Sequence, residues 1–163
     1  MITLVFAMMV AFAVSAPAQT LTSLNGENIN VEGRTGKVVV LAVGASWLPL
    51  SKEQAAIIAR LEKKYAGKAV EIYFVATDST NAKSKNYASD DALKAFALKN
   101  KIRADIMLRD SDGAKTLRKF AIDQLPSFVI LDKNGRMSGD AFGGIDPEVD
   151  LSVSLAKAID KLL

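Results

Sequence analysis

The chain of 163 residues contains no cysteine and no histidine. Without cysteine it has no thiol nucleophile, disulfide, thiolate zinc site or iron–sulfur cluster, and without histidine it has no imidazole base or imidazole metal ligand. A glycine loop with the spacing needed to bind phosphate is also missing. We therefore expect no cofactor and no metal, and any chemistry would have to rest on carboxylates, lysine, tyrosine or hydroxyl groups.

A large excess of one charge is also lacking. The chain has 21 Lys and Arg against 18 Asp and Glu, which gives a net charge of +3. This excess is far smaller than the concentrated basic footprint of nucleic-acid-binding proteins, so we expect no nucleic-acid partner. Half of the residues are hydrophobic, and a chain of this length can bury a core in one domain without covalent cross-links.

Residues 1–18 carry no charge. An apolar stretch over residues 2–14 is followed by small residues, a pattern that predicts a signal peptide, export to a periplasmic or extracellular space, and no stable membrane span after cleavage. The globular domain would then cover residues 19–163. The usual basic residue before the apolar stretch is missing, so an apolar first strand or core helix is the alternative.

Apolar runs predict the strands of the remaining chain. Apolar runs are typical of strands buried on both faces. They occur at Val38–Val43 and Phe128–Leu131, which are unbroken, and at Val70–Ala76, which includes Ile72, Phe74 and Val75 and is interrupted by Glu71. We also expect a short strand near Ile106–Leu108. The turn residues Asp132–Gly135 predict a hairpin with a returning strand over Arg136–Phe142, because Asn-Gly tolerates the positive φ values of such turns.

Helical periodicity and capping residues predict four helices. One covers about residues 52–66, a second is capped by Ser89, a short third begins at Asp112, and the last opens at Asp146-Pro147. Together the elements predict an α/β domain, a mixed central sheet flanked by helices, with a C-terminal hairpin and a terminal helix.

Two separated segments resemble one known family. Residues 36–53 read Gly-Lys, an apolar strand, and then Ala-Ser-Trp-Leu-Pro-Leu-Ser-Lys-Glu, and residues 109–136 contain a short helix, the pair Leu125-Pro126 and the hairpin. They are similar to the exported TlpA-type thioredoxin-like disulfide reductases, whose motif reads Gly-Lys, an apolar strand, and Ala-Ser/Thr-Trp-Cys-Pro-x-Cys-x-x-Glu. The resemblance implies a thioredoxin-like fold for nearly all of the chain after residue 20.

The resemblance also implies a lost redox centre. With Trp47 and Pro49 aligned, the two cysteines of the family fall on Leu48 and Ser51. Thiol–disulfide exchange begins with a thiolate, so we predict that this chain cannot perform it and has no catalytic residue. Ser51 has no histidine to activate it and no visible oxyanion site. A capping box between Ser51 and Gln54 explains the serine instead, in competition with a helix that begins at Pro49.

A docking surface is the second implication of the resemblance. In the family the peptide bond before the matching proline is cis, and the neighbouring backbone, here that of Leu125, pairs with an extended client segment. The candidate partner-binding residues are therefore Trp47, Pro49, Leu50, Leu125 and Pro126. The alternative is that Trp47 and Leu50 fold inward as core.

The resulting prediction is a redox-inactive binding or assembly module for envelope proteins, with extracytoplasmic proteins or extended peptide segments as partners. The alternative is a substrate-binding component of a redox system whose cysteines come from a partner.

Three further carboxylates, Asp78, Asp90 and Asp91, flank a polar loop after a strand. They could hold a hard cation, but helix capping and solvation explain them better.

Overall fold

The structure is a computed structural model that describes residues 19–110 and 112–163. The predicted signal peptide, residues 1–18, lies outside the described residues. Within those residues, no helix has both the length and the apolar character needed to cross a membrane.

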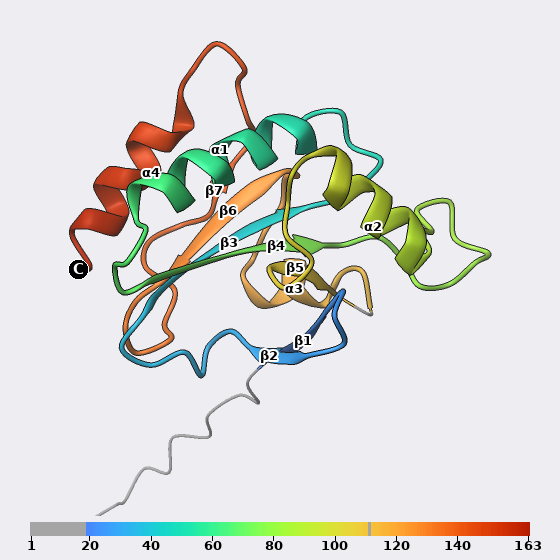
Figure 1. Cartoon of the computed structure of the whole chain (residues 1–163), viewed down its shortest axis with the longest axis horizontal. Helices are drawn as coiled ribbons and strands as arrows, with labels where there is room; N and C mark the ends of the chain where they lie inside the picture. The colour runs from blue at the N-terminus through green and yellow to red at the C-terminus, as the bar shows by residue number, and fades with distance from the viewer. Residues whose placement is uncertain (1–18, 111) are drawn as a thin grey trace, which may run out of the picture.

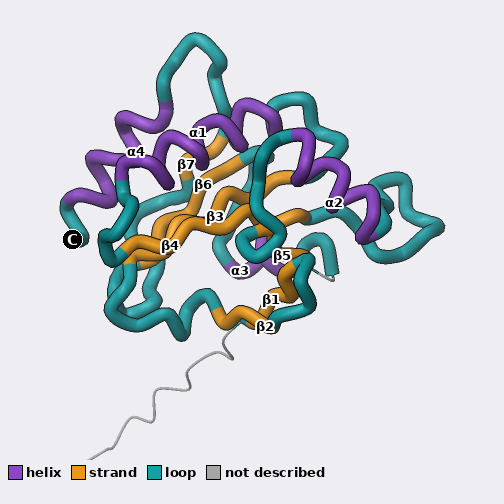
Figure 2. Tube along the Cα trace, in the orientation of Figure 1, coloured by secondary structure: helices purple, strands orange, loops and turns teal. Residues whose placement is uncertain are grey.

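A seven-stranded mixed sheet forms the centre of the domain, in the order β2-β1-β5-β4-β3-β6-β7 (Figures 1 and 2). Strands β3, β4 and β5 are parallel, and β6 lies antiparallel to β3. Every residue of β3 is buried, as its unbroken apolar run predicts. The strands are β1 (Thr20–Ser23), β2 (Asn28–Asn30), β3 (Val38–Gly44), β4 (Val70–Ala76), β5 (Met107–Arg109), β6 (Ser127–Leu131) and β7 (Phe142–Gly143).

Four helices flank the sheet: α1 (Ser51–Lys64), α2 (Asp90–Lys99), α3 (Lys115–Lys119) and α4 (Leu151–Asp160). Helices α1 and α4 lie together along one face, and α3 lies on the other side of the sheet (Figure 1). Helix α2 packs on β4, where the Phe96 ring lies 5.6 Å from that of Phe74. The predicted α/β architecture is confirmed.

The edges of the sheet differ from the prediction. Strands β1 and β2 were not expected, since each is too short to show a clear period. The returning strand over Arg136–Phe142 is wrong: only an isolated bridge between Leu131 and Met137 and the two residues of β7 pair with β6. In the turn, only Gly135 has a positive φ, and the Asp132 carboxylate holds the turn by accepting main-chain N–H groups.

Two helix starts also differ. Helix α4 begins after Asp150, whose carboxylate accepts the Ser152 N–H at 3.1 Å, whereas Asp146 caps only the preceding turn. The predicted start at Asp146-Pro147 is therefore wrong. Helix α3 begins at Lys115 rather than Asp112, and the buried Asp110 accepts the N–H of its second residue. The Ser89 cap of α2 is confirmed by the Ala92 N–H, 3.1 Å from the Ser89 hydroxyl.

Candidate functional site

The loop over residues 45–50 connects β3 to α1 and exposes apolar side chains. It turns through hydrogen bonds from the Leu48 N–H to the Ala45 carbonyl and from the Ser51 N–H to the Leu48 carbonyl, both 3.1 Å. Trp47 is 53% exposed and Pro49 is exposed, whereas Leu48 and Leu50 are half-buried. The alternative that Trp47 belongs to the core is therefore wrong.

Ser51 is not a helix cap. It is the first residue of α1 and is fully buried, and its hydroxyl accepts the Ala45 N–H at 3.4 Å. The N-cap residue is Leu50, which makes no side-chain capping bond. The predicted capping box is wrong, and the helix begins two residues after Pro49. Because the hydroxyl is enclosed and turned toward the main chain, it cannot reach a substrate as a nucleophile.

Gln54 is a central residue of the site, although its sequence pattern predicted only a capping role. It is fully buried, and its Nε2 donates to the carbonyls of Val43 (3.2 Å) and Ser127 (2.9 Å), so it connects α1 to β3 and β6. Its Oε1 has no hydrogen-bond donor among the described residues. A Cβ added at Gly44 would lie 2.4 Å from that oxygen, so the glycine is required by close packing.

At the three motif positions where the family has ionisable side chains, this chain has neutral ones. The motif places a glutamate three residues after its second cysteine, and the residue at that spacing is Gln54. The motif spacing was the signal that could have identified it. With Leu48, Ser51 and Gln54 in place, the centre offers neither a thiolate nor a carboxyl group, and its one hydroxyl is buried. The arrangement lacks the groups that thiol–disulfide exchange requires.

The loop before β6 lies beside this site. Val43 of β3 is paired with Ser127 of β6, so the residues just before Ser127 adjoin the loop over residues 45–50. The Leu125–Pro126 peptide bond is cis, as expected. Pro126 is buried, and its carbonyl accepts the Gly144 N–H at 3.2 Å, whereas Leu125 is half-buried. The main-chain N–H and carbonyl of Leu125 bind no other residue of the described chain.

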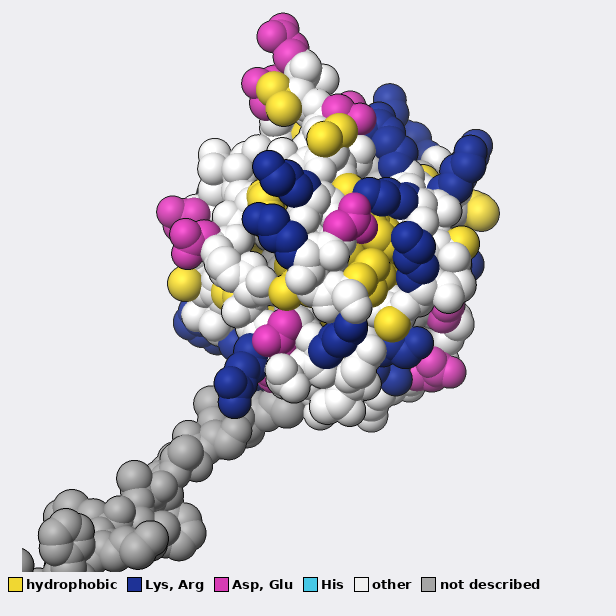
Figure 3. All heavy atoms as spheres, turned by 90° about the vertical axis from the view of Figure 1, so that its left-hand side faces the viewer, with side chains coloured by type: hydrophobic (Ala, Val, Ile, Leu, Met, Phe, Trp, Pro, Cys, Tyr) yellow, Lys and Arg dark blue, Asp and Glu magenta, His cyan; other side chains and the backbone are white. Residues whose placement is uncertain are grey.

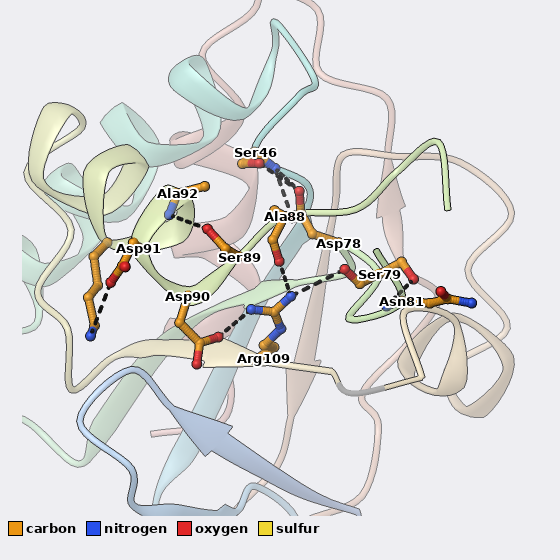
Figure 4. A network of polar contacts seen from close by, with 11 residues as sticks. Ser46, Asp78, Ser79, Asn81, Ala88, Ser89, Asp90, Asp91, Ala92 and Arg109 are labelled. Carbon is orange, nitrogen blue, oxygen red and sulfur yellow. Dashed lines mark hydrogen bonds and ion pairs between the residues drawn. The ribbon is translucent and has the colours of Figure 1, made fainter. Parts of the chain in front are cut away.

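A network of polar contacts holds the start of the loop over residues 45–50 (Figure 4). The buried Asp78 carboxylate accepts the Ser46 N–H at 3.0 Å and the Ser46 hydroxyl at 2.6 Å, directly before Trp47. Arg109 of β5 donates to the carbonyls of Ser79 and Ala88, and thereby closes the loop that follows Asp78. The network therefore holds the position from which Trp47 projects.

The three aspartates do not form one site. Asp78 serves Ser46, Asp90 pairs with Arg109, and the exposed Asp91 lies 3.8 Å from Lys94. The explanation by capping and solvation does not fit Asp78, which is buried and hydrogen-bonded within the core. No cluster of three potential metal-ligating side chains occurs in residues 19–110 and 112–163.

Comparison with known proteins is consistent with this geometry. A family model described as thioredoxin-like matches residues 36–137. Among curated proteins, a thiol-disulfide oxidoreductase ResA of Bacillus cereus is 27% identical over 122 residues, which cover 75% of this chain. The chain spans only 64% of the length of that relative.

Solved structures match over nearly the whole chain. A secreted Mycobacterium tuberculosis disulfide oxidoreductase homologous to E. coli DsbE aligns with a TM-score of 0.64 and 18% identity, over 89% of this chain and 96% of the other. The exposed lipoprotein thioredoxin Etrx1 of Streptococcus pneumoniae aligns with a TM-score of 0.67 and 16% identity, over 90% and 100%. At these identities the likeness shows a shared fold.

Proposed function

Because the chain belongs to the thioredoxin-like family and yet contains no cysteine, we propose that it is a redox-inactive member that binds extended segments of other exported proteins. Family members named as thiol-disulfide oxidoreductases need thiols for their reaction. Here those positions hold a half-buried leucine and a buried serine, so binding is the part of the activity that the site can retain.

The observation that carries the proposal is the surface between the two loops. We call the residues Trp47, Leu48, Pro49, Leu50 and Leu125 the docking face. Its apolar side chains are partly or largely exposed, and the Leu125 main chain has a free donor and acceptor among the described residues. An extended segment can pair with such backbone groups while its side chains pack on the apolar surface.

Export is part of the proposal. The uncharged apolar stretch over residues 2–14 has the composition of a signal peptide. Two proteins of similar fold are described as secreted and as an exposed lipoprotein. The partners would then be extracytoplasmic proteins, and the domain would assemble or hold them rather than change their disulfides.

The test is selection of extended peptides from a random library on the full chain, followed by affinity measurement with labelled peptides. Trp47→Ala should weaken binding at least tenfold, because it removes the largest exposed apolar side chain of the docking face. Val153→Ala is the matched control, since Val153 is 67% exposed on α4, beside Lys64 at the far end of α1. Equal affinities for the two variants, or a selection that enriches no peptide, would refute the binding role.

Redox activity is tested separately with an insulin reduction assay. The purified chain should give no turnover above buffer with dithiothreitol as reductant. A measurable rate would contradict the proposal. If a cysteine-containing redox protein, crosslinked at the docking face, restored turnover that the chain alone lacks, the function would instead be that of a substrate-binding component.

A further inference from the structure

Basic side chains from segments far apart in the sequence gather at one end of the sheet. The amino ends of β3 and β4, the carboxyl ends of α1 and α4, and the turn after β6 meet there (Figure 1). The Gly36 N–H donates to the Lys133 carbonyl, and the Lys133 ammonium donates to the Leu163 carbonyl. We call the following residues the basic end: Lys37, Lys63, Lys64, Lys68, Lys133, Arg136, Lys157 and Lys161.

Four of these side chains lie around the ends of α1 and α4. The ammonium groups of Lys64 and Lys68 lie 5.2 and 5.5 Å from the centre of the Tyr65 ring, and Lys64, Lys157 and Lys161 line a shared hollow between α1 and α4. Figure 3 views the molecule from this end, where dark blue side chains surround hydrophobic ones and magenta side chains are few in the middle.

The net positive charge of the molecule lies at this end. Two carboxylate side chains, those of Asp132 and Asp160, lie beside the basic end. Next to them Arg34 pairs with Glu71, Arg103 pairs with Glu62 and Asp105, and Glu27 lines the same hollow as Lys68. With these groups included, ten basic side chains face six acidic ones. The whole chain has 21 against 18, so the remainder has 11 against 12 and is close to neutral.

Helix termini explain only part of this pattern. Lys63, Lys64 and Lys157 lie in the last turns of α1 and α4, where a cation is stabilised by the helix dipole. Lys161 is the C-cap residue of α4 and fits the same rule. Lys37, Lys68, Lys133 and Arg136 do not, because they lie just before strands or in the hairpin turn. Of the exposed large apolar side chains, Val153 (67%) and Leu163 (42%) lie among these lysines.

We propose that the basic end rests on the surface of a bilayer that contains anionic phospholipids. Clustered lysines and arginines are attracted to such a surface, and their aliphatic stems and nearby apolar side chains fit its interfacial region. Helix α1 runs from the docking face to the basic end, and its 14 residues separate the two by about 20 Å. The docking face would therefore point away from the membrane and toward its partners.

The test is co-sedimentation of the full chain with vesicles of phosphatidylcholine alone or with added phosphatidylglycerol, at low and high salt. The test variant combines Lys37→Gln, Lys63→Gln, Lys157→Gln and Lys161→Gln, since none of these lysines has an ion pair in the described chain. Each basic side chain near an anionic surface strengthens binding about fivefold, so the loss of four should weaken binding to phosphatidylglycerol vesicles by about 600-fold. Wild-type binding should weaken at high salt.

The matched control removes the same charge elsewhere, with Lys83→Gln, Lys85→Gln, Lys99→Gln and Lys115→Gln, and should bind like the wild type. Residues 1–18 are identical in all three chains, so apolar insertion cannot explain a difference between them. Equal loss in both variants, or equal wild-type binding to both vesicle types, would overturn the proposal. So would retention on immobilised polyglutamate without vesicle binding, which would assign the surface to an acidic protein. Peptide binding at the docking face should be unchanged in both variants, so this inference and the proposed function fail separately.

Discussion

Gln54→Glu tests whether the centre of the site is as enclosed as the structure indicates. The Gln54 side chain is fully buried and donates to the carbonyls of Val43 and Ser127. A carboxylate at this position would face those two carbonyls without a compensating donor. Burial disfavours the charged form, and we expect it to raise the pKa of the introduced carboxyl by about two to three units. Each unit corresponds to 1.36 kcal/mol between the two protonation states, so ionisation would cost about 3–4 kcal/mol at pH 7.

Burial of the introduced carboxyl also sets the direction in which the stability of Gln54→Glu changes with pH. The pKa of the introduced carboxyl is higher in the folded than in the unfolded state, where it is about 4.3. Its destabilisation of the folded state is therefore smallest below about pH 4.3 and grows as the pH rises toward the folded pKa. The free energy of unfolding of Gln54→Glu should therefore fall relative to the wild type between pH 4 and 8. Urea denaturation followed by circular dichroism measures it.

Gln54→Ala is the comparison for this experiment. This substitution leaves two buried carbonyls without the amide donor and opens a void. Removal of the unpartnered Oε1 offsets part of the cost. We expect the free energy of unfolding to fall by about 2–4 kcal/mol. Because neither glutamine nor alanine titrates, this loss of stability should not vary with pH. If the destabilisation by Gln54→Glu were equally independent of pH, water would reach the position, and the enclosed site described above would be incorrect.

Three further predictions follow from other parts of the structure. Leu48→Cys combined with Ser51→Cys should restore measurable insulin reduction; a folded variant without activity would show that the loop geometry differs from that of the redox enzymes. Gly44→Ala should lower the free energy of unfolding by about 1–3 kcal/mol, because its Cβ would lie 2.4 Å from the Gln54 oxygen, and less in a Gln54→Ala background. The pKa of Asp132 is lowered by the main-chain N–H groups four and two residues later, so its contribution to stability is lost as the pH falls below the ordinary value of 3.8. Asp132→Asn should reduce the dependence of stability on pH in that acidic range, measured by urea denaturation.

The central strands and the cap of α2 could be predicted from local sequence. The unbroken apolar run of β3 leaves that strand no exposed face, so it must lie inside the sheet, and the apolar residues after Glu71 place β4 beside it. Ser89 caps α2 through a hydrogen bond to a residue three positions away. The start of α4 could not be predicted in the same way, since Asp146 and Asp150 are both suitable caps and tertiary contacts decide between them.

The candidate site could also be predicted only in part from local sequence. Leu48 and Ser51 could be assigned from motif spacing, but the capping box between Ser51 and Gln54 was wrong. A capping box is a local arrangement, whereas the Gln54 amide donates to Ser127, 73 residues further along the chain. That carbonyl is brought to α1 only by the pairing of β3 with β6, which no local pattern contains.

The sequence by itself determined that this protein has no thiol or imidazole chemistry, because the absence of a residue type holds in any conformation. It also determined the fold family, through strand periodicity and two motifs in the correct order. Only the tertiary structure decided that Ser51 and Gln54 are buried, that Asp78 holds the loop before Trp47, and that lysines from five segments form one basic end. Each of these features depends on residues distant in sequence, and the folded backbone alone sets the distances between them.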